Sequence, residues 1–412
     1  MPPNGFVFVK GDFLIMVYDF TRVKQFLDSM AVNRSPGNAI VICHKGKKVF
    51  SYSAGYSDLE KKKPFTGEEY VNIYSCSKVT TVTAAAQLLE RGAFLLRDPL
   101  YEYIPEYRYM AVSEQDGSLR DAVKPITVGD LFSMTAGFNY NLNSPSIKRA
   151  GEMTEGRYDT LTVVRELARE PLSFDPGTHW QYSLCHDVLA GLVEAVSGMK
   201  FRDYVKSNIF EPLGMTKSVY HHTEEVLAGM AEQYSFVPTG QSSKFDIVEA
   251  QKYGSAKDGT FVNVGKGVSH ILGPEYDSGG AGITTTVEDY AKLAAALSCG
   301  GISADGERIL SPYTVELMKV NRMTTPQLQK DFCWRQFIGY GYGLGVRTHI
   351  DRAVSGSVAP LGEFGWGGAA GASFYTDSVN SIAAFYVQHC LNPREEWYQP
   401  RLCNAVFSCF GN

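Results

Sequence analysis

A serine and a lysine three positions apart have the types and spacing that nucleophilic chemistry requires. Ser75 and Lys78 open a segment predicted to be a helix, because apolar residues recur at intervals of three and four before a glycine, at Val79, Val82, Ala86, Leu89 and Gly92. Positions i and i+3 share a helix face, so the amine can reach the hydroxyl. The helix N-terminus adds positive potential and free N–H groups, which favour a neutral lysine and stabilise an oxyanion beside Ser75. The pair predicts an acyl-accepting serine that needs no histidine.

A second Ser-x-x-Lys, at Ser197 and Lys200, serves as an internal comparison. Gly198 ends the helical pattern that precedes it, so Ser197 is predicted to be a cap or turn residue. The alternative for Ser75 is an N-capping serine followed by a surface lysine. The local pattern leaves both readings of Ser75 open.

A tyrosine between a turn and a helix is the third candidate. Tyr182 follows the Pro176-Gly177 turn and precedes a helical run over 188–196. A phenol near an amine can shuttle protons between the nucleophile and the leaving group. The alternative is a packed tyrosine whose hydroxyl bonds a backbone carbonyl.

The glycine-rich segment from Phe364 to Thr376 is predicted to be a strand. Its glycines allow another backbone, or a substrate, to approach closely. A strand edge beside Ser75 would offer the second N–H of an oxyanion hole. The alternative is close packing against a helix for steric reasons.

In chain order, three short motifs resemble those of the serine β-lactamase and DD-peptidase superfamily: Ser75-Cys-Ser-Lys78, Tyr182-Ser-Leu184 and Trp366-Gly-Gly368. The class C-like esterases, called family VIII carboxylesterases, are the most similar branch, and the resemblance extends from Phe20 to the C-terminus. It implies an α+β fold, in which an antiparallel sheet is flanked by helices and an all-helical domain is inserted.

The resemblance also implies roles for single residues. Ser75 would be the nucleophile, Lys78 the general base and Tyr182 its proton-relay partner, while the N–H groups of Ser75 and Ala369 would form the oxyanion hole. Substrate contacts are expected from five residues: Trp366, Gly367, Gly368, Leu184 and Tyr140.

Departures from the superfamily pattern concern the substrate. Leu184 stands where β-lactamases usually have asparagine, and Trp366 stands where lysine or histidine helps to hold a carboxylate. A charged hydrogen bond contributes about 1.5–3 kcal/mol, so its loss disfavours carboxylate substrates. We therefore expect a serine hydrolase that forms an acyl-enzyme with small neutral acyl or aryl esters. The alternatives are a β-lactamase or D-amino-acid peptidase of the same fold, transfer of the acyl group to an alcohol, and a non-catalytic binding module.

Sequence patterns and the resemblance together divide the chain into parts. Residues 1–19 are an N-terminal extension, 20–97 and 269–412 form the sheet domain, and 98–268 form a mostly helical domain. A hairpin is expected over 39–44 and 48–54, and strands over 341–350, 364–376 and 381–390. Helices are expected over 20–30, 287–297 and 394–410, with the first and last on one face of the sheet.

Composition excludes several classes of partner. The 412 residues carry a net charge of −5, and lysines cluster only at Lys45–Lys48 and Lys61–Lys63, which we expect at hairpin tips, so nucleic acid is not an expected partner. No apolar run is long enough to span a bilayer. A small-molecule ester or β-lactam-like substrate is the expected partner, and the oligomeric state stays open.

Cysteine and histidine placement predicts neither a metal site nor a cofactor. The 8 cysteines form no Cys-x-x-Cys pair, and His221-His222 has no ligand partner at suitable spacing. Free thiols favour a reducing compartment, and no signal peptide is evident, so a cytoplasmic protein is expected. Either Met1 or Met16 could be the natural start.

Overall fold

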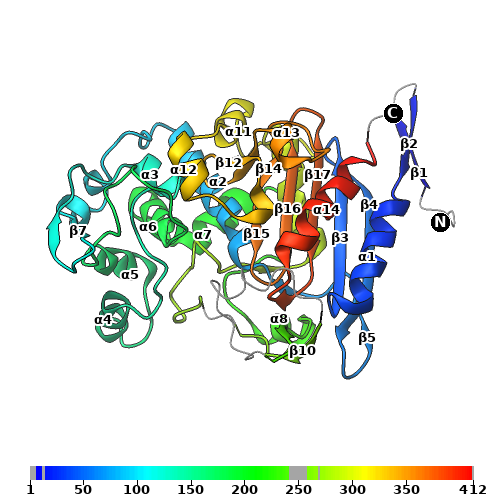
Figure 1. Ribbon diagram of the computed structural model, residues 1–412, viewed down its shortest axis with the longest axis horizontal. Coiled ribbons are helices and arrows are strands. Elements are labelled where there is room, and N and C mark those ends of the chain that lie inside the picture. Colours follow the sequence, from blue (N-terminus) through cyan, green and yellow to red (C-terminus); the bar gives the residue numbers. More distant parts are fainter. Residues whose placement is uncertain (1–5, 12–13, 241–257, 268–269, 411–412) are drawn as a thin grey trace.

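A central antiparallel sheet lies beside a largely helical region (Figure 1). The computed structural model describes residues 6–11, 14–240, 258–267 and 270–410. This is the β-lactamase/transpeptidase-like fold expected from the sequence, with helices and an antiparallel sheet in one chain.

The described strands are β1 (Phe6–Gly11), β2 (Leu14–Asp19), β3 (Gly37–His44), β4 (Lys47–Asp58), β5 (Lys63–Pro64), β6 (Val71–Asn72), β7 (Ala111–Ser113), β8 (Leu119–Asp121), β9 (Tyr234–Pro238), β10 (Gly259–Asn263), β11 (Thr284–Thr285), β12 (Tyr340–Tyr342), β13 (Arg347–His349), β14 (Phe364–Gly365), β15 (Gly367–Gly368), β16 (Ala372–Asp377), β17 (Ile382–Val387) and β18 (Cys390–Leu391).

The described helices are α1 (Thr21–Asn33), α2 (Ser77–Glu90), α3 (Val128–Phe132), α4 (Pro145–Met153), α5 (Thr160–Leu167), α6 (Cys185–Ser197), α7 (Phe201–Val205), α8 (Glu224–Gly229), α10 (Val287–Ser298), α11 (Pro312–Met318), α12 (Thr325–Lys330), α13 (Arg352–Ser355) and α14 (Glu395–Phe407). The 3₁₀ turns are η1 (Tyr74–Cys76), η2 (Leu100–Glu102), η3 (Pro105–Arg108) and η5 (Arg335–Phe337), and η4 (Lys206–Phe210) is a π-helix.

Alternation along the central strands gives the main sheet two buried faces. Its order is β12-β13-β14-β16-β17-β3-β4-β5, and β15 pairs with β16. In β3, Ile40 and Ile42 join the cluster that contains α1 and α14, whereas Val41 and Cys43 join the cluster on the opposite face. Successive strand residues point to opposite faces, so a strand covered on both faces is apolar throughout.

Helices cover each face of the sheet. α1 and α14 pack together on one face, as expected for the first and last helices, and α10 packs against β3, β16 and β17 on the other. α2 is buried on all sides from Ser77 to Leu88. A helix that is buried all round lies inside the protein, so α2 runs through the interior between the sheet and the helical region.

α6 is the central helix of the helical region, and it packs against α2, α3, α5 and α7. It ends at Ser197, because Gly198 adopts the left-handed conformation with φ 71°. Lys200 belongs to the next segment and pairs with Asp159. Ser197 is thus the last residue of α6, next to its C-cap, and Lys200 lies beyond the turn at Gly198.

The N-terminal extension contains a two-stranded hairpin, β1–β2, which projects from the rest of the molecule (Figure 1). The sequence analysis assigned no structure to it, and Met1 lies outside the described residues. The tip of the β3–β4 hairpin contains Lys45 and Gly46, both with positive φ, so that lysine cluster does lie at a hairpin tip.

Two expected strands were wrong in extent, since each folds back on itself. The run 341–350 forms β12 and β13 around a turn at Gly345, where φ is 73° and the Gly343 N–H donates to the Val346 carbonyl at 2.8 Å. The run 364–376 turns at Gly371, where φ is 81°, so that β15 pairs with β16. A glycine at positive φ reverses the chain, whereas the sequence pattern predicts strand residues at both positions.

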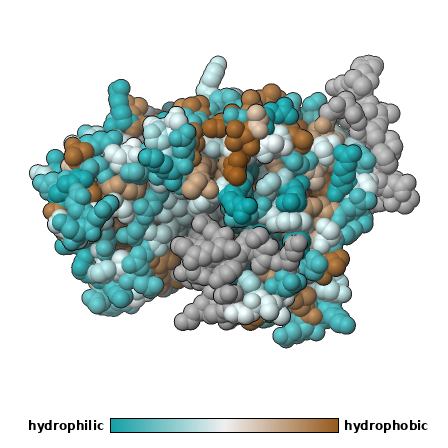
Figure 2. Space-filling view, viewed as in Figure 1, coloured by the Kyte–Doolittle hydropathy of each residue, from teal (hydrophilic) through white to brown (hydrophobic). Residues whose placement is uncertain are grey.

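The face shown in Figure 2 is mainly hydrophilic, with hydrophobic atoms in small groups. In the described part of the chain no helix has the length and apolarity needed to cross a membrane. Strands β9 and β10 fall within the segment expected to be mostly helical, and β9 pairs with β18. The domain boundaries stay a prediction, and residues 268 and 269 lie outside the described part.

Candidate active site

Ser75 lies in a tight turn at the entrance to α2. The turn η1 precedes the helix directly, so α2 begins two residues after Ser75 rather than at it. Tyr74 adopts φ 45°, a left-handed conformation that is costly for a residue with a side chain. Its hydroxyl donates to Gln233 Oε1 at 3.0 Å, which helps to hold the turn. The strained turn leaves Ser75 9% exposed.

Two hydrogen-bonding side chains converge on the Ser75 hydroxyl. Tyr182 Oη donates to Ser75 Oγ at 2.5 Å, and Lys78 Nζ lies 3.4 Å from the same oxygen. Lys78 is fully buried, one helical turn after Ser75. The structure thus brings together the serine, lysine and tyrosine that the sequence analysis selected, with separations that permit proton transfer.

A second phenol faces the same amine. Tyr140 Oη lies 3.4 Å from Lys78 Nζ, and the ring of Tyr140 stacks on the ring of Tyr182. Burial raises the pKa of Tyr140 well above its usual value, so this phenol is neutral near pH 7. Tyr140 therefore lies beside the catalytic candidates, in the loop before α4.

Aromatic side chains surround Tyr182. The ring of Trp366 stacks on Tyr182 with centroids 5.8 Å apart, and Trp366 is 2% exposed. It supports Tyr182 from behind more than it forms an open wall. The half-buried Trp334 meets Tyr182 edge-on at 5.3 Å. Sequence reasoning missed Trp334, and its only signal was an aromatic residue in the segment from Phe332 to Phe337.

Gly368, the second glycine after Trp366, lies against the Ser75 turn. A Cβ at Gly368 would clash with the carbonyl oxygen of Ile73, and β15 contacts η1. Ala369 is partly buried beside Tyr74. The expectation that the glycines of this segment allow close approach of another backbone is confirmed at Gly368. The use of the Ala369 N–H in an oxyanion hole stays a prediction.

Leu184 is part of the core. It is 2% exposed, and its N–H donates to the Asn139 carbonyl at 3.1 Å, which ties the loop of Tyr140 to the start of α6. Its expected contact with substrate stays a prediction, as do those of Trp366, Gly367, Gly368 and Tyr140.

Further groups around Lys78 were missed from the sequence. Lys78 Nζ donates to the Gly280 carbonyl at 2.7 Å. Asp187, in the first turn of α6, accepts from the Gly280 N–H at 3.2 Å and is 2% exposed. Asp187 follows Tyr182 by five residues, and that proximity was the only available signal. The sequence analysis expected a positive field here, whereas the structure adds a buried carboxylate.

Other candidates contribute no chemistry at this site. The Cys76 thiol points toward the Trp366 carbonyl, at 3.5 Å, and burial raises its pKa. His221 pairs with Asp277 at 2.7 Å. Within the described residues no group of three or more His, Cys, Asp or Glu could hold a metal ion.

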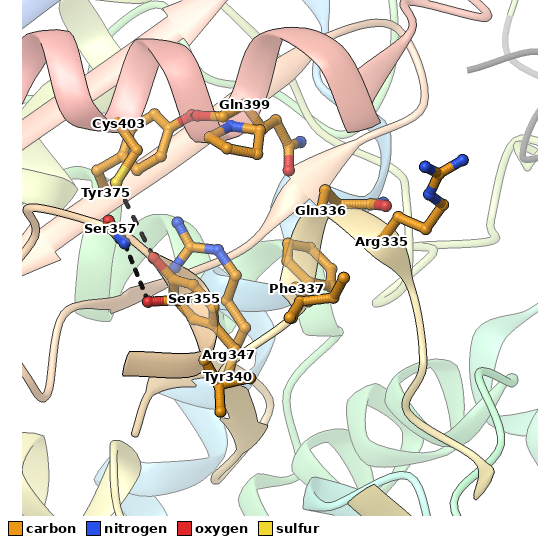
Figure 3. A pocket seen from close by; sticks show the side chains of 13 residues that line it. Arg335, Gln336, Phe337, Tyr340, Arg347, Ser355, Ser357, Tyr375, Gln399 and Cys403 are labelled. Carbon is orange, nitrogen blue, oxygen red and sulfur yellow. Dashed lines mark hydrogen bonds between the residues drawn. The ribbon is translucent and has the colours of Figure 1, made fainter. Parts of the chain in front are cut away.

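A separate pocket of about 200 Å³ lies on the α14 side of this region (Figure 3). Two of its polar side chains have buried partners. Arg347 forms a double hydrogen bond with the buried Glu363, and the Tyr375 hydroxyl donates to the Gln399 carbonyl. Gln399 also lies where a Cβ on Gly367 would project. The pocket thus flanks β15 on the side away from the Ile73 carbonyl, which faces Gly368.

Comparison with known proteins identifies the relatives. The family model described as Beta-lactamase matches residues 23–401. Protein Rv1367c of Mycobacterium tuberculosis (strain ATCC 25618 / H37Rv) is 27% identical over 364 residues, which covers 86% of each chain. Esterase EstB of Burkholderia gladioli is 25% identical over 376 residues and 87% of each chain. The structure of EstCE1, a hydrolase with promiscuous acyltransferase activity, superposes on this one with a TM-score of 0.73 at 23% sequence identity. The superposition covers 94% of this chain and 98% of the EstCE1 chain.

Proposed function

This chain belongs to the beta-lactamase family, and from that premise we propose that it is a serine hydrolase that cleaves small neutral esters through an acyl-enzyme. One observation carries the proposal. The Ser75 hydroxyl accepts a 2.5 Å hydrogen bond from Tyr182, and the buried Lys78 amine lies 3.4 Å away. The similarity to Esterase EstB supports the same conclusion.

Acylation uses these three side chains. Ser75 Oγ attacks the ester carbonyl carbon while its proton moves to the neutral Lys78 amine, and the carbonyl π electrons move to oxygen. The N–H groups of Ser75 and Ala369 stabilise that oxyanion. When the tetrahedral intermediate collapses, the C–O bond breaks and the leaving oxygen takes a proton through Tyr182, which is replenished from Lys78.

Deacylation repeats the cycle with water. The Lys78 and Tyr182 pair removes a proton from the water molecule as it attacks the acyl carbon. The tetrahedral intermediate then expels Ser75 Oγ, which regains its proton. The products are a carboxylic acid and free enzyme.

The surroundings of the site favour a neutral substrate. The half-buried ring of Trp334 meets Tyr182 edge-on, so a substrate would meet aromatic surface next to the nucleophile, while the buried Trp366 supports Tyr182 from behind. Leu184 and Trp366 replace polar residues that would hold the amide and carboxylate of a β-lactam. An aryl or short acyl ester fits this chemistry.

Hydrolysis of a short-chain aryl ester tests the proposal. Ser75→Ala should lower kcat/KM at least about a thousandfold, because the nucleophile is lost. Ser197→Ala, in the second Ser-x-x-Lys of the chain, is the matched control and should retain the wild-type rate. Mass spectrometry after brief exposure should find the acyl group on the peptide that contains Ser75.

Equal rates for wild type and Ser75→Ala would refute the proposal. A chromogenic cephalosporin and a D-amino-acid amide in the same assay separate the related activities. Rapid turnover of either one, with negligible ester cleavage, would replace the esterase assignment.

A further inference from the structure

The carboxylate of Asp187 is buried close to the proposed catalytic amine. One of its oxygens, Oδ1, accepts three hydrogen bonds: from Tyr276 Oη at 2.9 Å, Ser278 Oγ at 2.8 Å and the Gly280 N–H at 3.2 Å. These bonds fix the orientation of the carboxylate and of the segment that carries Gly280. The Gly280 carbonyl in turn accepts from Lys78.

The other oxygen of Asp187 has no hydrogen-bond partner in the described part of the chain. A Cβ placed on Gly280 would lie 2.5 Å from this Oδ2 and 3.2 Å from Lys78 Nζ. Both groups therefore lie beside the position that a Cβ of Gly280 would occupy. An unsatisfied carboxylate oxygen in the interior is costly, so its place beside an amine requires an explanation.

We infer that Asp187 is a positioning residue for acyl transfer to Ser75. Its carboxylate stabilises the positive charge on Lys78 while that amine carries the serine proton. This inference rests on the proposed function. As Ser75 Oγ bonds to the carbonyl carbon, its proton moves to Nζ and creates an ammonium that faces Asp187 Oδ2. When the C–O bond breaks, the proton leaves through Tyr182 and the amine becomes neutral again.

The remaining groups that face Lys78 do not carry negative charge near pH 7. Burial raises the pKa of Tyr140 well above its usual value. Burial lowers the pKa of His186 to about 3 and that of His270 to about 4, so both imidazoles are neutral. The Tyr182 hydroxyl donates a hydrogen bond to Ser75 Oγ. Among the side chains around Lys78, Asp187 is thus the one that can place a negative charge beside the amine.

Asp187→Asn isolates the charge. The amide oxygen of asparagine can still accept the bonds that Oδ1 accepts, and an uncharged NH2 group takes the place of Oδ2, so the negative charge beside Lys78 is lost. The amine then becomes a weaker proton acceptor, so kcat/KM for the aryl ester at high pH should fall about tenfold to a hundredfold. The acidic limb of the pH–rate profile should move to lower pH by about one unit or more. A nearby carboxylate favours the charged form of an amine, and the variant lacks that carboxylate.

Two controls separate charge from structure. Glu194→Gln removes a second buried carboxylate of α6, remote from Lys78, and should keep the wild-type profile. Tyr276→Phe removes one hydrogen bond to Oδ1 but keeps the charge, so its acidic limb should not move. Rates are divided by the fraction of enzyme that a fluorophosphonate labels, so only folded enzyme is counted.

Each outcome decides the inference. If wild type and Ser75→Ala cleave every tested ester at the same rate, the proposed function has failed. If wild type is active but Asp187→Asn keeps its rate and its acidic limb, the inference about Asp187 is overturned. Should Asp187→Asn not fold, Gly280→Ala places a methyl group between Oδ2 and Nζ, and an unchanged limb in that variant overturns the inference equally.

Discussion

The ring of Tyr140 lies parallel to the ring of Tyr182, with centroids 5.4 Å apart and planes inclined by 5°. Tyr140 Oη lies 3.4 Å from Lys78 Nζ, and the same amine lies 4.7 Å from the centroid of the Tyr182 ring. The Tyr182 hydroxyl instead donates to Ser75 Oγ at 2.5 Å. The stack therefore places two chemically identical groups at one lysine in different positions relative to the nucleophile. That asymmetry allows their roles to be separated by experiment.

Removal of the two hydroxyl groups should have unequal effects. Tyr182→Phe should lower kcat/KM for an aryl ester by about a hundredfold to a thousandfold, which is typical for loss of a proton relay. Tyr140→Phe should cost about tenfold or less, because it removes one hydrogen bond near Lys78. Both variants keep the aromatic ring and hence the stacking, so each serves as the other's control. A larger loss for Tyr140→Phe would exchange the two roles.

Gly368→Ala should damage the Ser75 turn. The added methyl group would clash with the Ile73 carbonyl, so β15 or the turn must move. We expect a loss of about 1–3 kcal/mol in the free energy of unfolding and a fall in kcat/KM for the remaining folded enzyme. Gly267→Ala is the control, since a Cβ there would have nothing within 4 Å. Unchanged activity in Gly368→Ala would show that β15 does not position Ser75.

Local patterns predicted most of the elements, and they selected the three residues that the structure brings together at Ser75. α2 and the β3–β4 hairpin follow from periodicity and turn residues that lie within a short segment of sequence. Ser75 and Lys78 are three positions apart, and the turn η1 leads directly into α2, so their proximity follows from local structure. Tyr182 was selected for its place between a turn and a helix, and the fold supplies its contact with Ser75.

The missed features depend on contacts between distant segments. Asp187 and Gly280 are 93 residues apart in the sequence, and nothing local to either residue indicates that they meet beside Lys78. The turns at Gly345 and Gly371 were missed for a different reason. Glycine suits both a close-packed strand and a left-handed turn, and only the observed positive φ distinguishes these uses.

Glu194→Gln should raise stability at neutral and alkaline pH. Burial raises the pKa of Glu194 to about 7. Between the unfolded pKa of about 4.3 and the folded one, the folded protein binds more protons, so the free energy of unfolding falls as the pH rises. Glutamine does not titrate, so the stability difference between variant and wild type should grow from near zero at low pH to about 2–3 kcal/mol above the folded pKa.

Urea unfolding of both proteins across that pH range measures the difference. Both proteins share all other titrating groups, so the subtraction isolates Glu194. A difference that stays constant with pH would show that Glu194 titrates alike in the folded and unfolded states.

Glu363→Gln should be strongly destabilising, because it leaves a buried guanidinium without its counter-ion. Arg347 bonds both oxygens of Glu363 at 3.0–3.2 Å, and the two side chains are 5% and 0% exposed. Loss of one partner of a buried pair costs about 3–5 kcal/mol. The control is Glu211→Gln, whose partner Lys206 lies 3.9 Å away on the surface, and it should change stability by less than about 1 kcal/mol. Urea unfolding at one pH compares the two, and equal effects would mean that water reaches Arg347 through the adjoining pocket in Figure 3.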